Sequence, residues 1–72
     1  MYKIYVGQNC PNCRVLKIKL KDRTDIEYAD VSDPTVLADA MLDNVTTLPS
    51  LVYGGKVYTD PRDIIKILMK VK

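Results

Sequence analysis

The sequence predicts an α/β fold with the element order βαβαββα, a four-stranded mixed sheet that carries helices on both faces. Short runs rich in Ile, Val and Tyr, which suit a pleated sheet, alternate with longer stretches whose apolar residues recur at helical spacing. Each helical stretch begins at a proline: Pro11, Pro34 or Pro61. Proline suits the first helical position because its fixed φ is helical and its missing N–H would be unpaired anyway.

The first half of the chain predicts a strand, a helix and a second strand. Residues 1–6 carry one charge and are expected to form a central or near-central strand. Residues 15–21 alternate apolar and basic side chains as a strand does, but Cys13, Leu16 and Leu20 recur at helical spacing. Pro11 favours a helix, which we expect to reach Asp22. Residues 26–31 form the next strand, and the crossover predicts that it lies parallel to the first.

The second half predicts a helix, a hairpin and a last helix. Asp33 is expected to cap the middle helix, which ends at Asp43-Asn44. Gly54-Gly55 lies between the strands expected at 50–53 and 56–59, which is a hairpin signal. Asp60 is expected to cap the last helix. The predicted apolar stripes are Val36, Leu37, Ala40 and Met41 in the middle helix, and Ile64, Ile65, Leu68 and Val71 in the last.

The composition of the chain limits the classes of function and partner that we expect. We expect one small domain over residues 1–72, since 47% of the residues are hydrophobic and the chain is short. The net charge of +2 and the dispersed tyrosines do not favour nucleic acid. The sequence shows no signal peptide and no apolar run near the ~20 residues that span a bilayer, so we expect no membrane partner. We expect a cytoplasmic monomer.

The two cysteines stand in the motif Cys10-Pro11-Asn12-Cys13, directly behind the first strand and its turn. The first turn of a helix has unpaired N–H groups and the positive end of the macrodipole, which stabilise an anion. A cysteine there loses its proton more easily, and the thiolate is the nucleophile. In a cytosolic protein, this motif at a strand–helix junction indicates a redox pair.

Other interpretations of the pair remain open. The sequence has no histidine and no third cysteine, so one chain does not supply a zinc site, and no metal ligand is predicted within it. A disulfide across two residues closes too small a loop to stabilise the fold much. Two buried thiols without a chemical role are the main structural alternative.

The element order, Cys10-Pro11-Asn12-Cys13 and Thr47-Leu48-Pro49 together resemble the glutaredoxin branch of the thioredoxin fold, in its minimal form. The resemblance covers nearly the whole chain, including the run from Tyr28 to Asp33. It implies a thiol–disulfide oxidoreductase, a glutaredoxin/thioredoxin-like enzyme that reduces protein disulfides.

The resemblance also implies roles for individual residues. Cys10 would be the nucleophile and Cys13 the resolving thiol. Pro49 would follow a cis peptide bond, which an X-Pro bond adopts at little cost. Substrate would contact Pro11 and Asn12 at the motif, and Thr47, Leu48 and Pro49 in the facing loop. Leu48 would offer its backbone to an extended partner segment. Arg14 is expected to stabilise the Cys10 thiolate, or else to be a surface charge.

The sequence departs from glutaredoxins where they hold glutathione. Gly7 replaces a basic residue, Asn12 replaces a tyrosine, and the Gly-Gly-x-Asp segment is absent. Thr59 to Ile64 more closely resembles the redoxins that serve ribonucleotide reductase. No bound cofactor is expected. Reducing equivalents would come from a thioredoxin reductase-like flavoprotein or from glutathione, and ribonucleotide reductase is a candidate partner. Contacts to glutathione are conceivable from Lys56, Asp60, Arg62 and Asp63, although the acids suit a helix cap better.

Two rival functions remain. Two chains that each supply Cys10 and Cys13 could hold a zinc or iron–sulfur (2Fe–2S) centre with four thiolates. Alternatively, the chain is a binding module whose thiols have no function.

Overall fold

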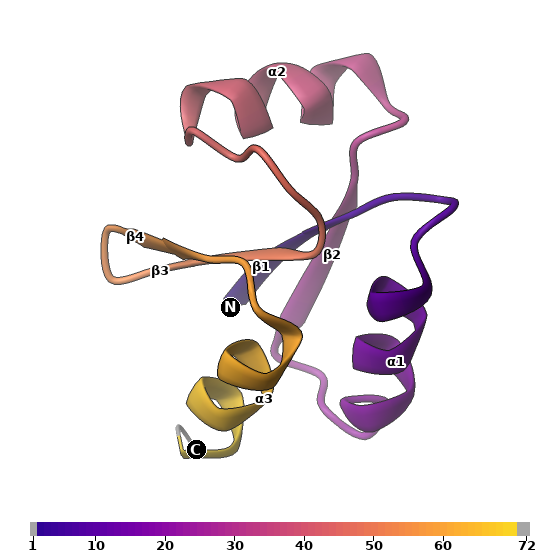
Figure 1. Cartoon of the computed structure of the whole chain (residues 1–72), viewed down its shortest axis with the longest axis vertical. Helices are drawn as coiled ribbons and strands as arrows, with labels where there is room; N and C mark the ends of the chain where they lie inside the picture. Colours follow the sequence, from indigo (N-terminus) through magenta and orange to yellow (C-terminus); the bar gives the residue numbers. More distant parts are fainter. Residues whose placement is uncertain (1, 71–72) are drawn as a thin grey trace.

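The computed structural model describes residues 2–70. Its elements follow the predicted order (Figure 1). They are β1 (Tyr2–Val6), α1 (Pro11–Lys19), β2 (Ile26–Asp30), α2 (Pro34–Leu42), β3 (Ser50–Tyr53), β4 (Lys56–Tyr58) and α3 (Pro61–Lys70). The proline at each helix start therefore predicted where these helices begin. Met1 and Val71, which we placed in the first strand and in the last apolar stripe, lie outside the described residues.

The sheet is mixed and its strand order is β2-β1-β3-β4. β1 and β2 are parallel, with Tyr2 opposite Ile26, whereas β1–β3 and β3–β4 are antiparallel. β1 is thus an inner strand, as predicted from its low charge. The β3–β4 hairpin turns at Gly54 and Gly55, whose φ angles of 58° and 78° lie where side chains are disfavoured.

The helices cover the sheet unequally. α1 and α3 lie together on one face, and α2 lies alone on the other (Figure 1). The larger core fills the α1/α3 face and consists of Ile4, Val6, Cys13, Leu16, Leu20, Leu51, Ile64 and Leu68. The smaller core under α2 has Tyr5, Ala29 and Ala40 as its buried members. Within residues 2–70, no helix is long and apolar enough to cross a membrane.

α1 is shorter than predicted. It ends at Lys19 instead of Asp22, and the N–H of Leu20 bonds to the carbonyl of Leu16. The chain must turn here because the carbonyl of Asp25 accepts the N–H of Tyr2, which begins the pairing of β1 with β2. Arg23 fixes this turn: its guanidinium binds the Asp25 carboxylate and donates to the carbonyl of Leu68 in α3.

The apolar stripe predicted for α2 is not a buried stripe. Ala40 is 2% exposed and Val36 is half-buried, but Leu37 and Met41 are 47% and 70% exposed. A helix that lies alone on a sheet face has no neighbouring helix to cover its flanks. The predicted helical spacing was correct, but the predicted buried face of α2 was too wide, because it included Leu37 and Met41.

Candidate functional site at the start of the first helix

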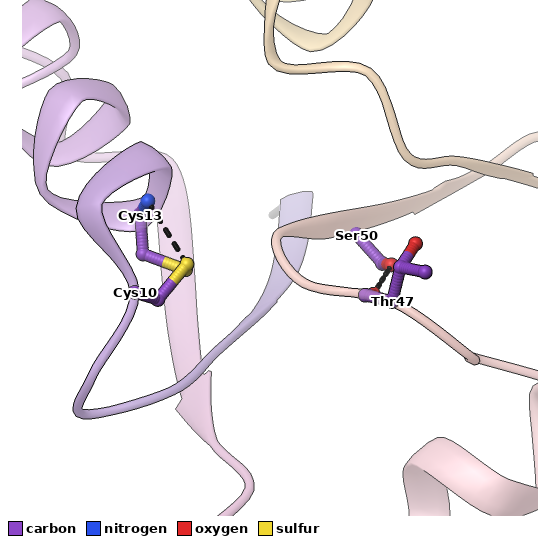
Figure 2. Close-up of a disulfide and its surroundings, with 4 residues drawn as sticks. All are labelled: Cys10, Cys13, Thr47 and Ser50. Atoms are coloured by element: carbon purple, nitrogen blue, oxygen red, sulfur yellow. Dashed lines mark hydrogen bonds between the residues drawn. A yellow bond between two sulfur atoms is a disulfide. The ribbon is translucent and has the colours of Figure 1, made fainter.

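Cys10 is the N-cap of α1. Its backbone is extended, with φ −130° and ψ 98°, and Pro11 is the first helical residue. The N–H of Cys13 donates to the Cys10 sulfur across 3.2 Å (Figure 2). A sulfur thus occupies the place where a serine or aspartate oxygen usually caps a helix. The same N–H is positioned to stabilise a negative charge on that sulfur.

The two sulfurs are joined in a disulfide, and the two Cα atoms are 5.2 Å apart (Figure 2). The sulfurs differ in environment. Cys10 is half-buried and lines a surface cleft, whereas Cys13 is 1% exposed and packs in the larger core with Leu16 and Ile64. An external sulfur can therefore approach Cys10 but not Cys13.

The cleft at Cys10 has a volume of about 470 Å³. It brings together five of the predicted site residues: Cys10, Pro11, Asn12, Thr47 and Leu48. Pro49 is fully buried and does not line the cleft. Arg14 is exposed, and within residues 2–70 its side chain forms no hydrogen bond and no ion pair. The structure thus gives no contact by which Arg14 would hold the Cys10 sulfur.

The loop opposite Cys10 offers a free stretch of backbone. The Leu48–Pro49 peptide bond is cis. The hydroxyl of Ser50, a fully buried residue, donates to the carbonyl of Thr47 and holds the loop together (Figure 2). Within residues 2–70, neither the N–H nor the C=O of Leu48 forms a hydrogen bond. These two groups can therefore pair with an extended segment of another molecule.

Three further residues line the cleft that we had not predicted as site residues: Gly7, Asn9 and Thr46. Gly7 is the informative one. A β-carbon at position 7 would lie 2.9 Å from Cδ1 of Leu48, closer than carbon atoms pack. The absence of a side chain at Gly7 therefore leaves room for Leu48. A signal for this position was present in the sequence, because Gly7 stands where the resemblance leads one to expect a basic residue.

The turn that leads to Cys10 is tethered to the end of β2. The amide of Gln8 donates to the Ser32 hydroxyl at 3.3 Å, and the N–H of Ser32 donates to Asp30 Oδ1 at 2.9 Å. The bond from Ser32 lowers the pKa of Asp30, because it stabilises the carboxylate. Among the described residues, no charged side chain lines the cleft itself. The polarity around Cys10 thus comes from backbone groups and uncharged side chains.

The possible glutathione contacts are arranged as a helix cap. Asp60 Oδ1 accepts the N–H of Arg62 at 2.9 Å, and Arg62 Nε lies 3.7 Å from the same oxygen. Asp60 therefore caps the start of α3, and the exposed guanidinium of Arg62 lies beside its carboxylate. Among residues 2–70, no group of three or more His, Cys, Asp or Glu side chains is placed to hold a metal ion.

The fold is that of thioredoxin-like proteins. The crystal structure of the thioredoxin-like protein BC3987 aligns over all of both chains, with a TM-score of 0.72 and 23% identity. The structure of a threonine-to-alanine mutant of BC3987 aligns over 99% of this chain and 97% of its own, with a TM-score of 0.75 and 24% identity. No protein-family model and no curated protein sequence matches this chain.

Proposed function

We propose that this protein is a thiol–disulfide oxidoreductase that reduces protein disulfides through Cys10 and Cys13. The observation that carries the proposal is the asymmetry of the disulfide. One sulfur faces an open cleft at a helix start, and the other is buried behind it. A purely structural disulfide needs no such cleft, and it would stabilise the chain little because its loop is so short.

The reaction begins with the reduced pair. The thiolate of Cys10, held by the N–H of Cys13 and the start of α1, attacks one sulfur of a target disulfide. A bond forms between Cys10 and that sulfur, and the target's other sulfur leaves as a thiolate that takes a proton from water. The product is a mixed disulfide between the two proteins.

Cys13 then completes the exchange. Its thiol loses a proton to solvent and attacks the Cys10 sulfur, which forms the Cys10–Cys13 bond and releases the target's second thiolate. The target disulfide has gained two electrons and the Cys10–Cys13 pair has lost them. The 5.2 Å separation of the Cα atoms allows this ring to close without movement of the helix.

The loop at Leu48 supports the choice of protein disulfides as substrates. An extended segment that pairs with the free N–H and C=O of Leu48 would pass across the cleft that holds Cys10. A small disulfide gains little from such pairing. We therefore infer that the backbone of the target, and not its cysteine alone, contributes to binding.

We further propose a flavoprotein of the thioredoxin reductase kind as the electron donor. The glutathione-binding segment of glutaredoxins is absent from the sequence, and the acid that could replace it, Asp60, is engaged with Arg62. Ribonucleotide reductase stays a predicted target. Arg14 stays a predicted stabiliser of the thiolate, now without a contact in its favour.

Two cysteine variants test the reaction. We expect Cys10→Ser to abolish reduction of a protein disulfide. We expect Cys13→Ser to accumulate a mixed disulfide, which non-reducing gels and mass spectrometry detect. If Cys10→Ser retains exchange and Cys13→Ser loses it, the roles are reversed, and if both variants keep wild-type activity the proposal is wrong.

Two coupled assays test the donor. One supplies NADPH with a thioredoxin reductase, and the other supplies NADPH with glutathione and its reductase. Turnover in the first assay alone supports our inference, whereas turnover in the second would require residues such as Asp60 to bind glutathione. No turnover in either assay, together with metal in the purified protein, would favour the pair of chains bridged by a metal, which stays a prediction.

A further inference from the structure

A groove runs between α1 and α3, on the face of the sheet opposite α2 (Figure 1). Its volume is about 530 Å³. α1 contributes Val15 and Lys19 to its walls, and α3 contributes Arg62 and Ile65. Asn12 lines both this groove and the cleft that holds the reacting sulfur, the thiol cleft. The groove therefore leads away from the thiol cleft between the two helices.

The groove is apolar along its middle and positively charged at its far end. Lys19 lies seven residues, or about 10 Å, along α1 from Asn12. Val15 lies between them and is 44% exposed, and Ile65 of α3 is half-buried. A segment that enters the groove would thus meet apolar surface first and the Lys19 ammonium second.

The two helices that form the groove are basic. α1 carries Arg14, Lys17 and Lys19 and no acidic residue, and α3 carries three basic residues and one acidic residue. α2, on the other face of the sheet, carries Asp39 and no basic residue. Within residues 2–70, none of the three basic side chains of α1 forms an ion pair. An acidic partner therefore finds uncompensated positive charge on this face.

We propose that the groove binds a segment of the target protein that carries an apolar side chain and, further from the reacting cysteine, an acidic one. The segment is continuous with the cysteine that exchanges with Cys10, and it leaves the thiol cleft past Asn12. The inference rests on the proposed function and adds a partner preference to it. Targets carry a carboxylate a few residues from the reacting cysteine, and a basic residue there is disfavoured.

The length of the groove fixes the spacing in the target. An extended segment advances about 3.3 Å per residue, so the distance from Asn12 to Lys19 corresponds to about three residues. With the reacting cysteine in the thiol cleft, the apolar side chain lies about two residues from it and the acid about four or five. Apolar contact at the centre of a site with charges at its rim is the usual arrangement of a protein interface.

The acid of the segment belongs at Lys19 because the charges at the other end of the groove are already compensated. β1 and β4 run in the same direction, so α1 and α3 start at the same edge of the sheet. Among the described residues, Asp60 is the one acid that lines the groove, and its Oδ1 lies 3.7 Å from Arg62 Nε at the start of α3. A carboxylate of the target is repelled there by Asp60, whereas Lys19 has no such neighbour in the lining.

The test uses peptides whose cysteine is linked through a disulfide to 2-nitro-5-thiobenzoate. The Cys10 thiolate of the Cys13→Ser variant attacks the peptide sulfur, forms the mixed disulfide and releases the coloured thiolate. Each peptide has leucine two residues from the cysteine and glutamate four and five residues from it, on the N-terminal or on the C-terminal side. It is paired with a peptide that has glutamine in place of both glutamates.

We expect glutamate on one of the two sides to raise the second-order rate constant about threefold over glutamine at low salt. The ratio should approach one in 1 M salt, where the Debye length is about 3 Å. Lysine at the same positions should give a rate below that of glutamine.

A matched pair of α1 variants locates the effect. Lys19→Gln, made in the Cys13→Ser background, should bring the glutamate-to-glutamine rate ratio close to one. Lys17→Gln is the control, because it removes an equal charge from the same helix outside the groove, where Lys17 Nζ lies 5.5 Å from the centre of the Tyr28 ring. It should keep most of the ratio.

NMR spectra of the trapped mixed disulfide give a readout that does not depend on rates. Between the glutamate and glutamine peptides, the backbone amide signals of Val15, Lys19 and Ile65 should differ in position, and those of α2 should coincide. Differences confined to α2 would overturn the proposal.

Each contrary rate has a distinct meaning. Equal rates for glutamate and glutamine on both sides of the cysteine, or a ratio that survives Lys19→Gln, would overturn the groove and leave the proposed function standing. A ratio lost equally in Lys17→Gln and Lys19→Gln would mean general attraction to the basic face, and our assignment to the groove would be wrong. Failure to release the thiolate from every peptide would overturn the proposed function itself.

Discussion

The hydroxyl of Tyr5 donates a 2.6 Å hydrogen bond to Oδ2 of Asp43, a residue 38 positions further along the chain. Tyr5 is fully buried in β1, and Asp43 is the C-cap of α2. Asn44 follows with a φ of 60°, and the chain then enters the loop that carries Leu48. This bond thus fixes the point at which the loop that carries Leu48 leaves α2.

Removal of that hydroxyl should cost stability. For Tyr5→Phe we expect the free energy of unfolding to fall by about 1–1.5 kcal/mol, because a hydrogen bond to a charged partner is lost. The cost stays small, since the exposed carboxylate of Asp43 regains water. Urea unfolding measures it. Tyr53→Phe is the control, because within residues 2–70 the Tyr53 hydroxyl forms no hydrogen bond; an equal loss in both variants would contradict the prediction.

The same tyrosine should make the fold sensitive to alkali. Burial, reinforced by the bond to Asp43, raises the pKa of Tyr5 above the ordinary value of 10.0. The unfolded chain ionises first, so this contribution is complete below pH 10.0 and is lost as the pH rises through the folded-state pKa. The interaction of Lys3 with Tyr5, whose ring centre lies 4.9 Å from Lys3 Nζ, also raises the pKa of Lys3, and this contribution is lost in the same direction.

We therefore expect the urea midpoint of the wild type to fall as the pH rises above 10.0, and to fall less steeply in Tyr5→Phe. Tyr28, whose pKa burial also raises, accounts for part of the slope that remains. Parallel pH profiles for the wild type and Tyr5→Phe would show that Tyr5 does not carry this linkage.

Features that depend on neighbouring residues of the chain were predictable from the sequence, whereas contacts between residues far apart in the chain were not. Pro11, Pro34 and Pro61 begin the helices because their effect depends on the neighbouring backbone alone. The exposure of Met41 could not be predicted, since helical spacing does not say how much of a helix its neighbours cover. The approach of Gly7 to Leu48 depends on the pairing of β1 with β3, and no local pattern encodes it.

A methyl group at position 7 should disturb the thiol site more than the fold. Gly7 does not have a left-handed φ, so the cost of Gly7→Ala is its contact with Cδ1 of Leu48. That atom ends a flexible side chain, and we expect the free energy of unfolding to change by less than about 1 kcal/mol. Displacement of Leu48 should slow the exchange of Cys10 with a protein disulfide by up to ~tenfold.

A double-mutant cycle separates that contact from other effects of Gly7→Ala. Leu48→Ala removes the Cδ1 atom and should lower the rate by itself. If the contact is the cause, Gly7→Ala should add almost no further loss in the Leu48→Ala background. Full additivity of the two losses would show that position 7 acts by another route.

Asp33 is the N-cap of α2, as the sequence predicted. Asp33 Oδ1 accepts the N–H of Thr35 at 2.9 Å and caps the helix that carries Leu37 and Met41. Asp33→Ala should lower the free energy of unfolding by about 1 kcal/mol. Asp33→Asn keeps an acceptor oxygen and should lose much less, so equal losses in urea unfolding would mean that the side chain does not act as a cap.

Ser50 should link the stability of the loop to the exchange reaction. Its buried hydroxyl donates to the carbonyl of Thr47, and Ser50→Ala leaves that acceptor without this donor. We expect a loss of about 1–2 kcal/mol in the free energy of unfolding. Because the bond closes the loop around Leu48, the rate with a protein disulfide should fall more than the rate with a small aromatic disulfide. Thr59→Ala, an exposed change outside the loop, is the control. An equal fall with both disulfides would mean that Ser50 supports Cys10 directly and that the loop does not position the target.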